Sequence, residues 1–469
     1  MIFFSFSFLF FLLQFVLRLG SDTPDSFHFQ FILGASLILG YFLLLFKKDS
    51  PFSVKFEFSP ANIFFALFLV FVIFQFLKSF YSQALQGQEN VSGLSQISLD
   101  SLLERVFFVA FFFLSAQFFK RKSVVLQMAN AMALVAFFVA LNAIPNLLAG
   151  KFFYLNKAGK QVFFYPIFYF HKWIGQYILG RYSSSNRTGD VIAFGFFLAL
   201  GVAVYFFQLW HEAKRGENDT DIKQSVPFPF ILLRLTFAMV IGGAVLLFFS
   251  RGTTSFFLLA LVFYFLILSV RFFSKYRLIL GSVILFMTVS LCWAGNFPKL
   301  WKEIQTLRIE KEALHNDRAT DEHRSKSLYT NIEGSKRALK IYHENPIWGA
   351  GMDHYSMISS KYATPGIKDD YVDYFVLSHY LQQLAELGVG AYIYFLFLLA
   401  YFGQVLVGLF LTKSSFKFIM ALSLVMPVFV ALGHASINDL MEHFSMAMLV
   451  YMSMGASLGI LRKDFEHTA

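Results

Sequence analysis

Two arginines and one histidine stand out in this sequence, because each comes shortly before a long apolar run. They are Arg181, Arg251 and His379. A guanidinium presents a fixed fork of N–H donors that suits two oxygens of a phosphate group. An imidazole, whose ordinary pKa is about 6.5, suits a general base at neutral pH. Together the three residues predict a site that binds an anionic group and removes a proton.

Arg251 lies in a tight turn with the sequence Ser-Arg-Gly-Thr-Thr, between two apolar runs. The turn is too short to form a solvated loop, so Arg251 could also serve as an anchor at the membrane interface. Gly252 would let another backbone segment approach closely, and Thr253 and Thr254 could cap the following helix. Both the anion clamp and the interfacial anchor remain open at this stage.

Arg181 begins the stretch Arg-Tyr-Ser-Ser-Ser-Asn-Arg, which leads into the next apolar run. Its hydroxyl groups could N-cap that helix, and the first turn would then present backbone N–H groups to an anion. Arg187 closes the stretch and competes with Arg181 as the phosphate contact.

His379 belongs to a polar stripe on a predicted helix. It recurs with Gln382, Gln383 and Glu386 at i, i+3, i+4 and i+7, so the four side chains share one helix face. The stripe ends at Gly388, where the next apolar run begins, and it predicts the wall of a cavity. A solvated helix face is the alternative.

The remaining polar clusters have a structural interpretation. His434 and Asp439 lie in one short turn, where they could hydrogen-bond one another or orient a neighbouring group. The acidic and histidine residues within 310–323 fit a solvated helix better than a cation site. The sequence contains one cysteine and neither an HExxH nor a CxxC motif, so we expect no metal and no cofactor.

The elements that position these residues are predicted to be membrane-spanning helices. Hydrophobic residues make up 57% of the 469 residues and charged residues 14%, whereas a soluble domain carries about 25% charged residues. Apolar runs of roughly 20 residues span a bilayer as helices, because backbone groups find no water there. The sequence therefore predicts an all-α integral membrane protein with about twelve spans. They lie at 2–19, 28–46, 61–79, 104–119, 124–148, 190–209, 228–249, 253–270, 276–295, 388–411, 416–433 and 440–461.

The distribution of basic residues predicts the orientation. Loops rich in Lys and Arg alternate with loops that are poor in them, and the basic loops should face the cytoplasm. Both termini are then cytoplasmic, and the segments 149–189 and 296–387 lie on the outer side. The latter is a long loop between the ninth and tenth spans. The net charge of +10 is explained by this topology, so nucleic acid is not expected as a partner.

Several motifs follow one another between residues 180 and 460. They are Ser-Arg-Gly at 250–252, Asn-Pro-Ile-Trp-Gly-Ala-Gly at 345–351, the stretch 379–390 and the turn 434–439. In order and spacing they resemble the superfamily of O-antigen ligases and O-antigen polymerases. The segment from Arg181 to Asn186 resembles a weaker element of that family. Some features differ from the family pattern. Tyr380 stands where asparagine is common, and for the arginine that often precedes the Asn-Pro element, near Asn331, Arg324 is only a loose substitute. The segment at Arg181 lacks the family's proline, and one more residue separates His434 from Asp439.

The resemblance implies a GT-C-like membrane glycosyltransferase that needs no metal. Its donor would be an undecaprenyl-diphosphate-linked glycan, and its acceptor the lipid A core or a nascent polysaccharide. Arg181 and Arg251 would bind the diphosphate, and His379 would activate the acceptor hydroxyl. Direct displacement would invert the anomeric configuration. The candidate supporting residues are Arg187, Gln383, Glu386, His434 and Asp439.

The implied location is the bacterial inner membrane, with the reaction on the periplasmic side, where membrane lipid surrounds the protein. Residues 1–150 would contribute spanning helices, and residues 151–469 would form the catalytic region. Three other functions are considered. A polymerase carries the same motifs, whereas a transporter or flippase for lipid-linked glycans would need ionisable groups deep in the membrane. A non-catalytic assembly protein would leave the grouping of Arg181, Arg251 and His379 unexplained.

Overall fold

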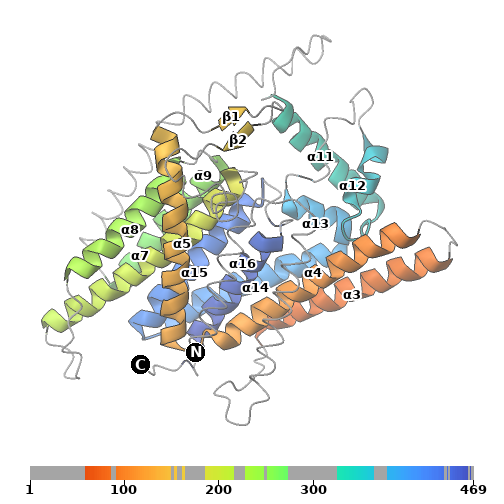
Figure 1. Cartoon of the computed structure of the whole chain (residues 1–469). Coiled ribbons are helices and arrows are strands. Elements are labelled where there is room, and N and C mark those ends of the chain that lie inside the picture. Colours follow the sequence, from red (N-terminus) through yellow and green to blue (C-terminus); the bar gives the residue numbers. More distant parts are fainter. Residues whose placement is uncertain are drawn as a thin grey trace.

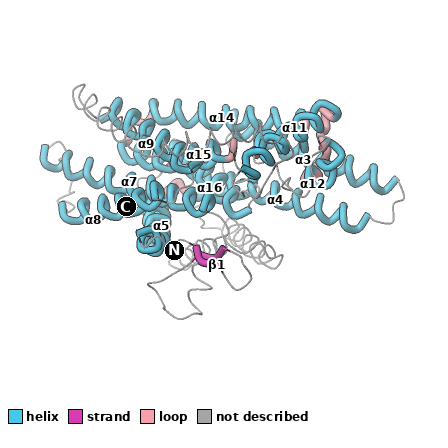
Figure 2. Tube along the Cα trace, turned by 90° about the horizontal axis from the view of Figure 1, so that it is seen from above, coloured by secondary structure: helices cyan, strands magenta, loops and turns pink. Residues whose placement is uncertain are grey.

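The chain folds into a bundle of long helices that run side by side (Figures 1 and 2). The structure is a computed structural model, and it describes residues 59–85, 91–148, 153–155, 161–163, 185–215, 228–247, 251–272, 325–363, 376, 378–437, 441, 444–462 and 465. The long helices are α3 (Pro60–Leu85), α4 (Val91–Phe118), α5 (Lys122–Leu148), α7 (Ser185–Arg215), α8 (Phe228–Leu247), α9 (Arg251–Phe272), α14 (Val389–Leu411), α15 (Ser415–His434) and α16 (Phe444–Leu461).

The described part of the chain confirms the helical membrane architecture. By length and composition, 7 of its helices could cross a membrane, and α5 and α16 contain shorter apolar stretches. Three predicted spans, at 2–19, 28–46 and 276–295, lie outside the described residues. Each of the other predicted spans coincides with one of the long helices.

The helix boundaries differ from the prediction where polar residues extend an apolar run. α4 begins at Val91, well before the predicted start at 104, and α7 continues to Arg215. Hydropathy marks only the part of a helix that can lie in lipid, so it misses such extensions. The segment 149–189 also contains a short hairpin that was not predicted, in which β1 (Phe153–Leu155) pairs with β2 (Gln161–Phe163) in antiparallel register.

Phenylalanine and tyrosine rings fill the interior where the N-terminal helices meet the C-terminal ones. α3 packs on α14, and α4 packs on α16. Phe65 of α3 stacks on Phe397 of α14 with ring centroids 4.2 Å apart, and on Tyr451 of α16 at 5.3 Å. Stacked and edge-to-face rings pack efficiently across such helix contacts. The helices of the N-terminal region are thereby part of the same bundle as the C-terminal helices.

The basic ends of several helices gather at one end of the bundle. At the end of α9, Arg271 donates to the carbonyl of Thr412, between α14 and α15, at 2.7 Å. At the start of α15, Lys417 donates to the carbonyl of Arg462 at 2.8 Å. Lys122 of α5 lies over the ring of Phe416. The opposite end of the bundle therefore holds the start of α9, the end of α15 and the start of α14.

A smaller helical unit caps that opposite end. It consists of α11 (Ser325–Glu344), α12 (Tyr355–Ile358), the 3₁₀ helix η1 (Ser359–Tyr362) and α13 (His379–Leu387). A small apolar core, which includes Ala338, Ile341 and Tyr355, lies among these elements. α13 lies between α11 and the start of α14 (Figure 1). Within the predicted loop 296–387, the described residues 325–363 and 378–387 are thus largely helical, and the Asn-Pro element at 345–351 follows the end of α11.

Candidate functional site

The polar stripe of α13 is buried in the protein. His379, Gln382, Gln383 and Glu386 have exposed fractions of 2%, 0%, 1% and 1%. The alternative that these residues form a solvated helix face is therefore wrong. α13 turns its polar face inward, which is opposite to the usual pattern of a surface helix.

His379 is the first residue of α13, and its surroundings tie it to the end of α15. Its backbone N–H donates to the carbonyl of Ala435, the residue after His434, at 2.9 Å. Its ring meets the edge of Tyr394 in α14, with centroids 5.7 Å apart and planes at 84°. The position of the imidazole is thus set by both α14 and α15.

Glu386 lies two turns further along α13 and links this helix to α12. Its Oε1 accepts hydrogen bonds from the backbone N–H of Tyr355 at 3.4 Å and from Nε2 of Gln382 at 3.2 Å. A buried carboxylate is tolerated only where donors and charges compensate for lost water. Glu386 therefore belongs to the polar framework behind the His379 helix.

The Asn-Pro element packs directly on the C-terminal end of α13. Gly351 N–H donates to the carbonyl of Glu386 at 3.0 Å, and Val389 N–H donates to the carbonyl of Ile347 at 3.1 Å. Gln75 of α3 reaches into the same junction, where its Nε2 donates to the carbonyls of Trp348 and Glu386 at 2.6 Å each. The two glycine-containing motifs, which are far apart in the sequence, thus form one backbone joint.

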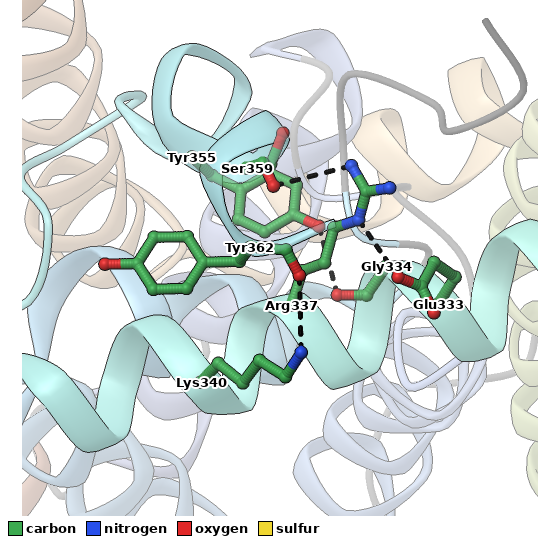
Figure 3. A network of polar contacts seen from close by, with 7 residues as sticks. All are labelled: Glu333, Gly334, Arg337, Lys340, Tyr355, Ser359 and Tyr362. Carbon is green, nitrogen blue, oxygen red and sulfur yellow. Dashed lines mark hydrogen bonds and ion pairs between the residues drawn. The ribbon is translucent and has the colours of Figure 1, made fainter. Parts of the chain in front are cut away.

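A buried arginine holds α11 against the 3₁₀ helix. Arg337 has an exposed fraction of 1%. Its Nε lies 3.3 Å from Oε1 of Glu333, and its Nη1 donates to the carbonyl of Ser359 at 3.4 Å (Figure 3). Beside it, the hydroxyl of Tyr355 donates to the carbonyl of Gly334 at 3.0 Å. Burial raises the pKa of Tyr355 far above its ordinary value, so this hydroxyl stays protonated and remains a donor.

A second buried cluster lies where α7, α9 and α15 meet. Nδ1 of His434 is 2.7 Å from Oδ2 of Asp190 and 3.1 Å from Oγ1 of Thr253. The ring also occupies the space beside Gly252, where an added Cβ would lie 2.5 Å from Nε2. Gly252 therefore makes room for an imidazole, where the sequence predicted a backbone segment. Thr253 is the third residue of α9, so its hydroxyl bonds within this cluster and does not cap the helix.

The predicted site residues are described to different extents. Arg181 and Asp439 lie outside the described residues, and for Arg187 and Arg251 only the backbone is described. Arg187 lies in the first turn of α7, and Arg251 is the first residue of α9. The start of α9 and the start of α13 meet at the adjacent residues His434 and Ala435. The structure thus brings the backbones of Arg251 and His379 to one joint.

Three residues at this end of the bundle were missed in the sequence. Nothing in the sequence marked Arg337 or Gln75 as part of a site, because neither lies in a recognisable motif. Asp190 did give one, since an acidic residue at the start of an otherwise apolar span is unusual. Among the described residues, no group of three His, Cys, Asp or Glu side chains could hold a metal ion.

The comparisons with known proteins address the part of the chain that contains most of these features. No curated protein matches the chain. Residues 235–396 match the family model described as O-Antigen ligase. The matched region contains Arg251, the Asn-Pro element and the whole of α13. It confirms the resemblance seen in the short motifs: over these residues the chain is similar to the O-antigen ligase family.

Proposed function

We propose that this protein is an O-antigen ligase-type glycosyltransferase. It moves a glycan from undecaprenyl diphosphate to an acceptor hydroxyl on the lipid A core. The reaction takes place on the periplasmic side of a bacterial inner membrane, in which both termini face the cytoplasm. One observation carries this proposal. The helices that begin with Arg251 and His379 meet at the adjacent residues His434 and Ala435. Both helices lie within the matched residues 235–396.

The proposed reaction forms one bond and breaks one. The acceptor oxygen attacks the anomeric carbon of the donor sugar while the bond from that carbon to the diphosphate oxygen breaks. The hydroxyl proton passes to His379, and undecaprenyl diphosphate leaves with the bonding electron pair. Attack from the face opposite the leaving group inverts the anomeric configuration. A positioned base of this kind contributes roughly 10²–10⁴-fold to the rate.

Negative charge grows on the diphosphate as it leaves, and cationic donors aimed at it lower the barrier. We assign this role to Arg181 and Arg251, with Arg187 as a supporting contact. Two of these three lie at helix starts, in the first turns of α7 and α9. The N-terminal end of a helix favours an anion, which adds to the effect of the guanidinium groups. The protein would then need no divalent cation.

The polar residues behind α13 have a supporting role in this scheme. Gln383 and Glu386 share the buried face of α13 with His379. Both keep that face polar, and Glu386 also fixes the helix against α12 with its side chain and against the Asn-Pro element with its backbone carbonyl. Catalytic groups work only when their supporting contacts hold them within a fraction of an ångström. A lipid-linked donor would enter sideways from the membrane while its glycan remains in water.

The experiment is complementation of a deletion strain followed by glycan profiling. Arg251→Ala and His379→Ala should each stop transfer and cause carrier-linked glycan to accumulate. Arg271→Ala changes an arginine at the other end of α9, and His343→Ala changes an exposed histidine of α11, so both controls should transfer normally. Wild-type glycan in the Arg251 or His379 variant, at normal expression, would reject the assignment.

The same profile separates a ligase from a polymerase of the superfamily. Loss of a ligase leaves free lipid core together with polymer on the carrier. Loss of a polymerase leaves cores that carry a single repeat unit. Loss of a flippase would instead trap the carrier-linked unit on the cytoplasmic face, where externally added enzymes cannot reach it.

A further inference from the structure

The buried pair of Asp190 and His434 has no part in the reaction described above. Asp190 is fully buried and His434 has an exposed fraction of 2%. Their Oδ2 and Nδ1 atoms are 2.7 Å apart. Burying such a pair costs free energy, and removing one partner leaves a buried polar group or charge that is costly by itself. The pair joins α7 to α15 at the point where both meet the start of α9.

The residues that follow Arg251 are both held by this pair. Gly252 lies against the ring of His434, as the lack of room for a Cβ shows. Thr253 lies 3.1 Å from Nδ1 of His434 and also hydrogen-bonds the Asp190 carboxylate. Gly189, next to Asp190, packs on Thr253, since a Cβ there would lie 3.1 Å from Cγ2 of that threonine. The first turn of α9 is therefore fixed in place by contacts from two other helices.

The same geometry argues against His434 as the base itself. An imidazole oriented by a carboxylate is a common arrangement for proton transfer. Here, however, the nitrogen that faces away from Asp190 is Nε2, and it lies against Gly252 of α9. An acceptor hydroxyl would have to displace that helix turn to reach it. The pair is placed to hold α9.

We propose that Asp190 and His434 are positioning residues for Arg251, and that they set the affinity of the protein for the diphosphate of its lipid carrier. The inference rests on the proposed function, which makes Arg251 a diphosphate ligand. By fixing Gly252 and Thr253, the pair fixes the backbone turn that carries Arg251. A displacement of about 1 Å can cost a factor of about 10² in such a site.

The pair also connects this arginine to the proposed base. The carbonyl of Ala435, adjacent to His434, accepts the hydrogen bond from the backbone N–H of His379 at 2.9 Å. A shift of His434 would therefore move the starts of α9 and α13 together. The pair would thus affect both the position of Arg251 and its distance from the proposed base, His379.

The test measures binding of undecaprenyl diphosphate to the full chain purified in detergent. Arg251→Ala should abolish binding. Asp190→Asn keeps the shape of the side chain but removes its charge, and it should weaken binding at least about tenfold, or 1.4 kcal/mol. His434→Asn can still donate to Asp190 and should keep more affinity than His434→Ala. Gly252→Ala, which pushes on the imidazole, should weaken binding without removing a polar group.

Tyr264→Phe is the matched control. It removes a buried hydrogen bond at 3.1 Å between Tyr264 of α9 and Ser423 of α15, the two helices that meet at Gly252 and His434, but away from the start of α9. Its unfolding temperature should fall as in Asp190→Asn, while binding stays at the wild-type level. An equal loss of binding in Tyr264→Phe would show that the pair only stabilises packing and would overturn the inference.

The outcomes separate the two proposals. If the wild-type chain does not bind undecaprenyl diphosphate, or if Arg251→Ala binds it normally, the proposed donor site is wrong. If Arg251→Ala loses binding while Asp190→Asn retains it, only the positioning role is wrong. Asp190→Asn decides the question even if His434→Ala does not survive purification.

Discussion

Gly349 and Gly388 face one another across the joint between the Asn-Pro element and α13. Both have a positive φ, at +64° and +56°. A Cβ on Gly388 would lie 2.7 Å from the backbone nitrogen of Gly349. L-residues with a side chain rarely adopt this backbone region, so glycine is required for conformation as well as for space. The glycines of the two motifs therefore meet at one backbone contact.

We expect Gly388→Ala to destabilise the unit that carries His379. Strain at positive φ costs about 1–3 kcal/mol, and the backbone collision adds to it. Gly403→Ala is the control, because Gly403 lies within α14 with nothing within 4 Å of a Cβ. In a helix interior that change should stabilise by about 0.5–1 kcal/mol. Unfolding in detergent measures both variants, and a Gly388→Ala protein as stable as Gly403→Ala would contradict the prediction.

Removing Arg337 should loosen α11 from the rest of the outer unit. Arg337→Met leaves Glu333 buried without its ion-pair partner, which typically costs 3–5 kcal/mol. Limited proteolysis should then cut α11 faster, while the spanning helices stay resistant. Adding Glu333→Leu to this variant removes the buried charge and should restore much of the resistance. If the single variant resists proteolysis as well as the wild type, the ion pair is not a stabilising contact.

Glu386→Gln should lower stability while leaving most of the transfer activity of the folded protein. Its Oε1 could still accept one hydrogen bond, but the new amide N–H groups would have to find partners in a buried site, at about 1–3 kcal/mol. A polar-framework role predicts a lower unfolding temperature and a normal rate below that temperature. Complete loss of transfer in a protein with wild-type stability would mean that Glu386 contacts the substrate.

The sequence predicted those parts of the fold that depend on hydropathy, and the site residues that lie in short motifs. Apolar runs locate spans because lipid imposes a single requirement on the backbone. Asp190 and Arg337 could not be found in this way, because their partners come from other helices and their burial arises only in the folded chain. The direction of the α13 polar stripe was open for the same reason. Periodicity shows that four residues share a face, but the packing of α12, α14 and the end of α15 against α13 determines that the face is buried.

We expect the N-terminal region to be inseparable from the catalytic region. Gln75 of α3 bonds to the carbonyls of Trp348 and Glu386, and Phe71 stacks on Trp348 with centroids 5.7 Å apart. Gln75→Leu should therefore reduce transfer by disturbing the Asn-Pro joint, although it lies outside the matched domain. Leu67→Gln, at a half-exposed position of the same helix, changes polarity without touching the joint. Equal transfer by Gln75→Leu and the wild type would show that the contact of α3 with the Asn-Pro joint does not contribute to activity.

Chelation of divalent cations should leave the reaction unchanged if arginines carry the diphosphate charge. The measurement uses the purified chain in nanodiscs with an undecaprenyl-diphosphate-linked glycan and lipid A core, since chelators also disturb lipopolysaccharide in whole cells. Transfer in EDTA should proceed at the rate found with added Mg²⁺. Arg251→Lys retains a positive charge but loses the bidentate fork, so it should keep partial activity that added Mg²⁺ does not raise. A rate that falls in EDTA and returns with Mg²⁺ would assign the charge neutralisation to a cation and remove the need for the arginine clamp.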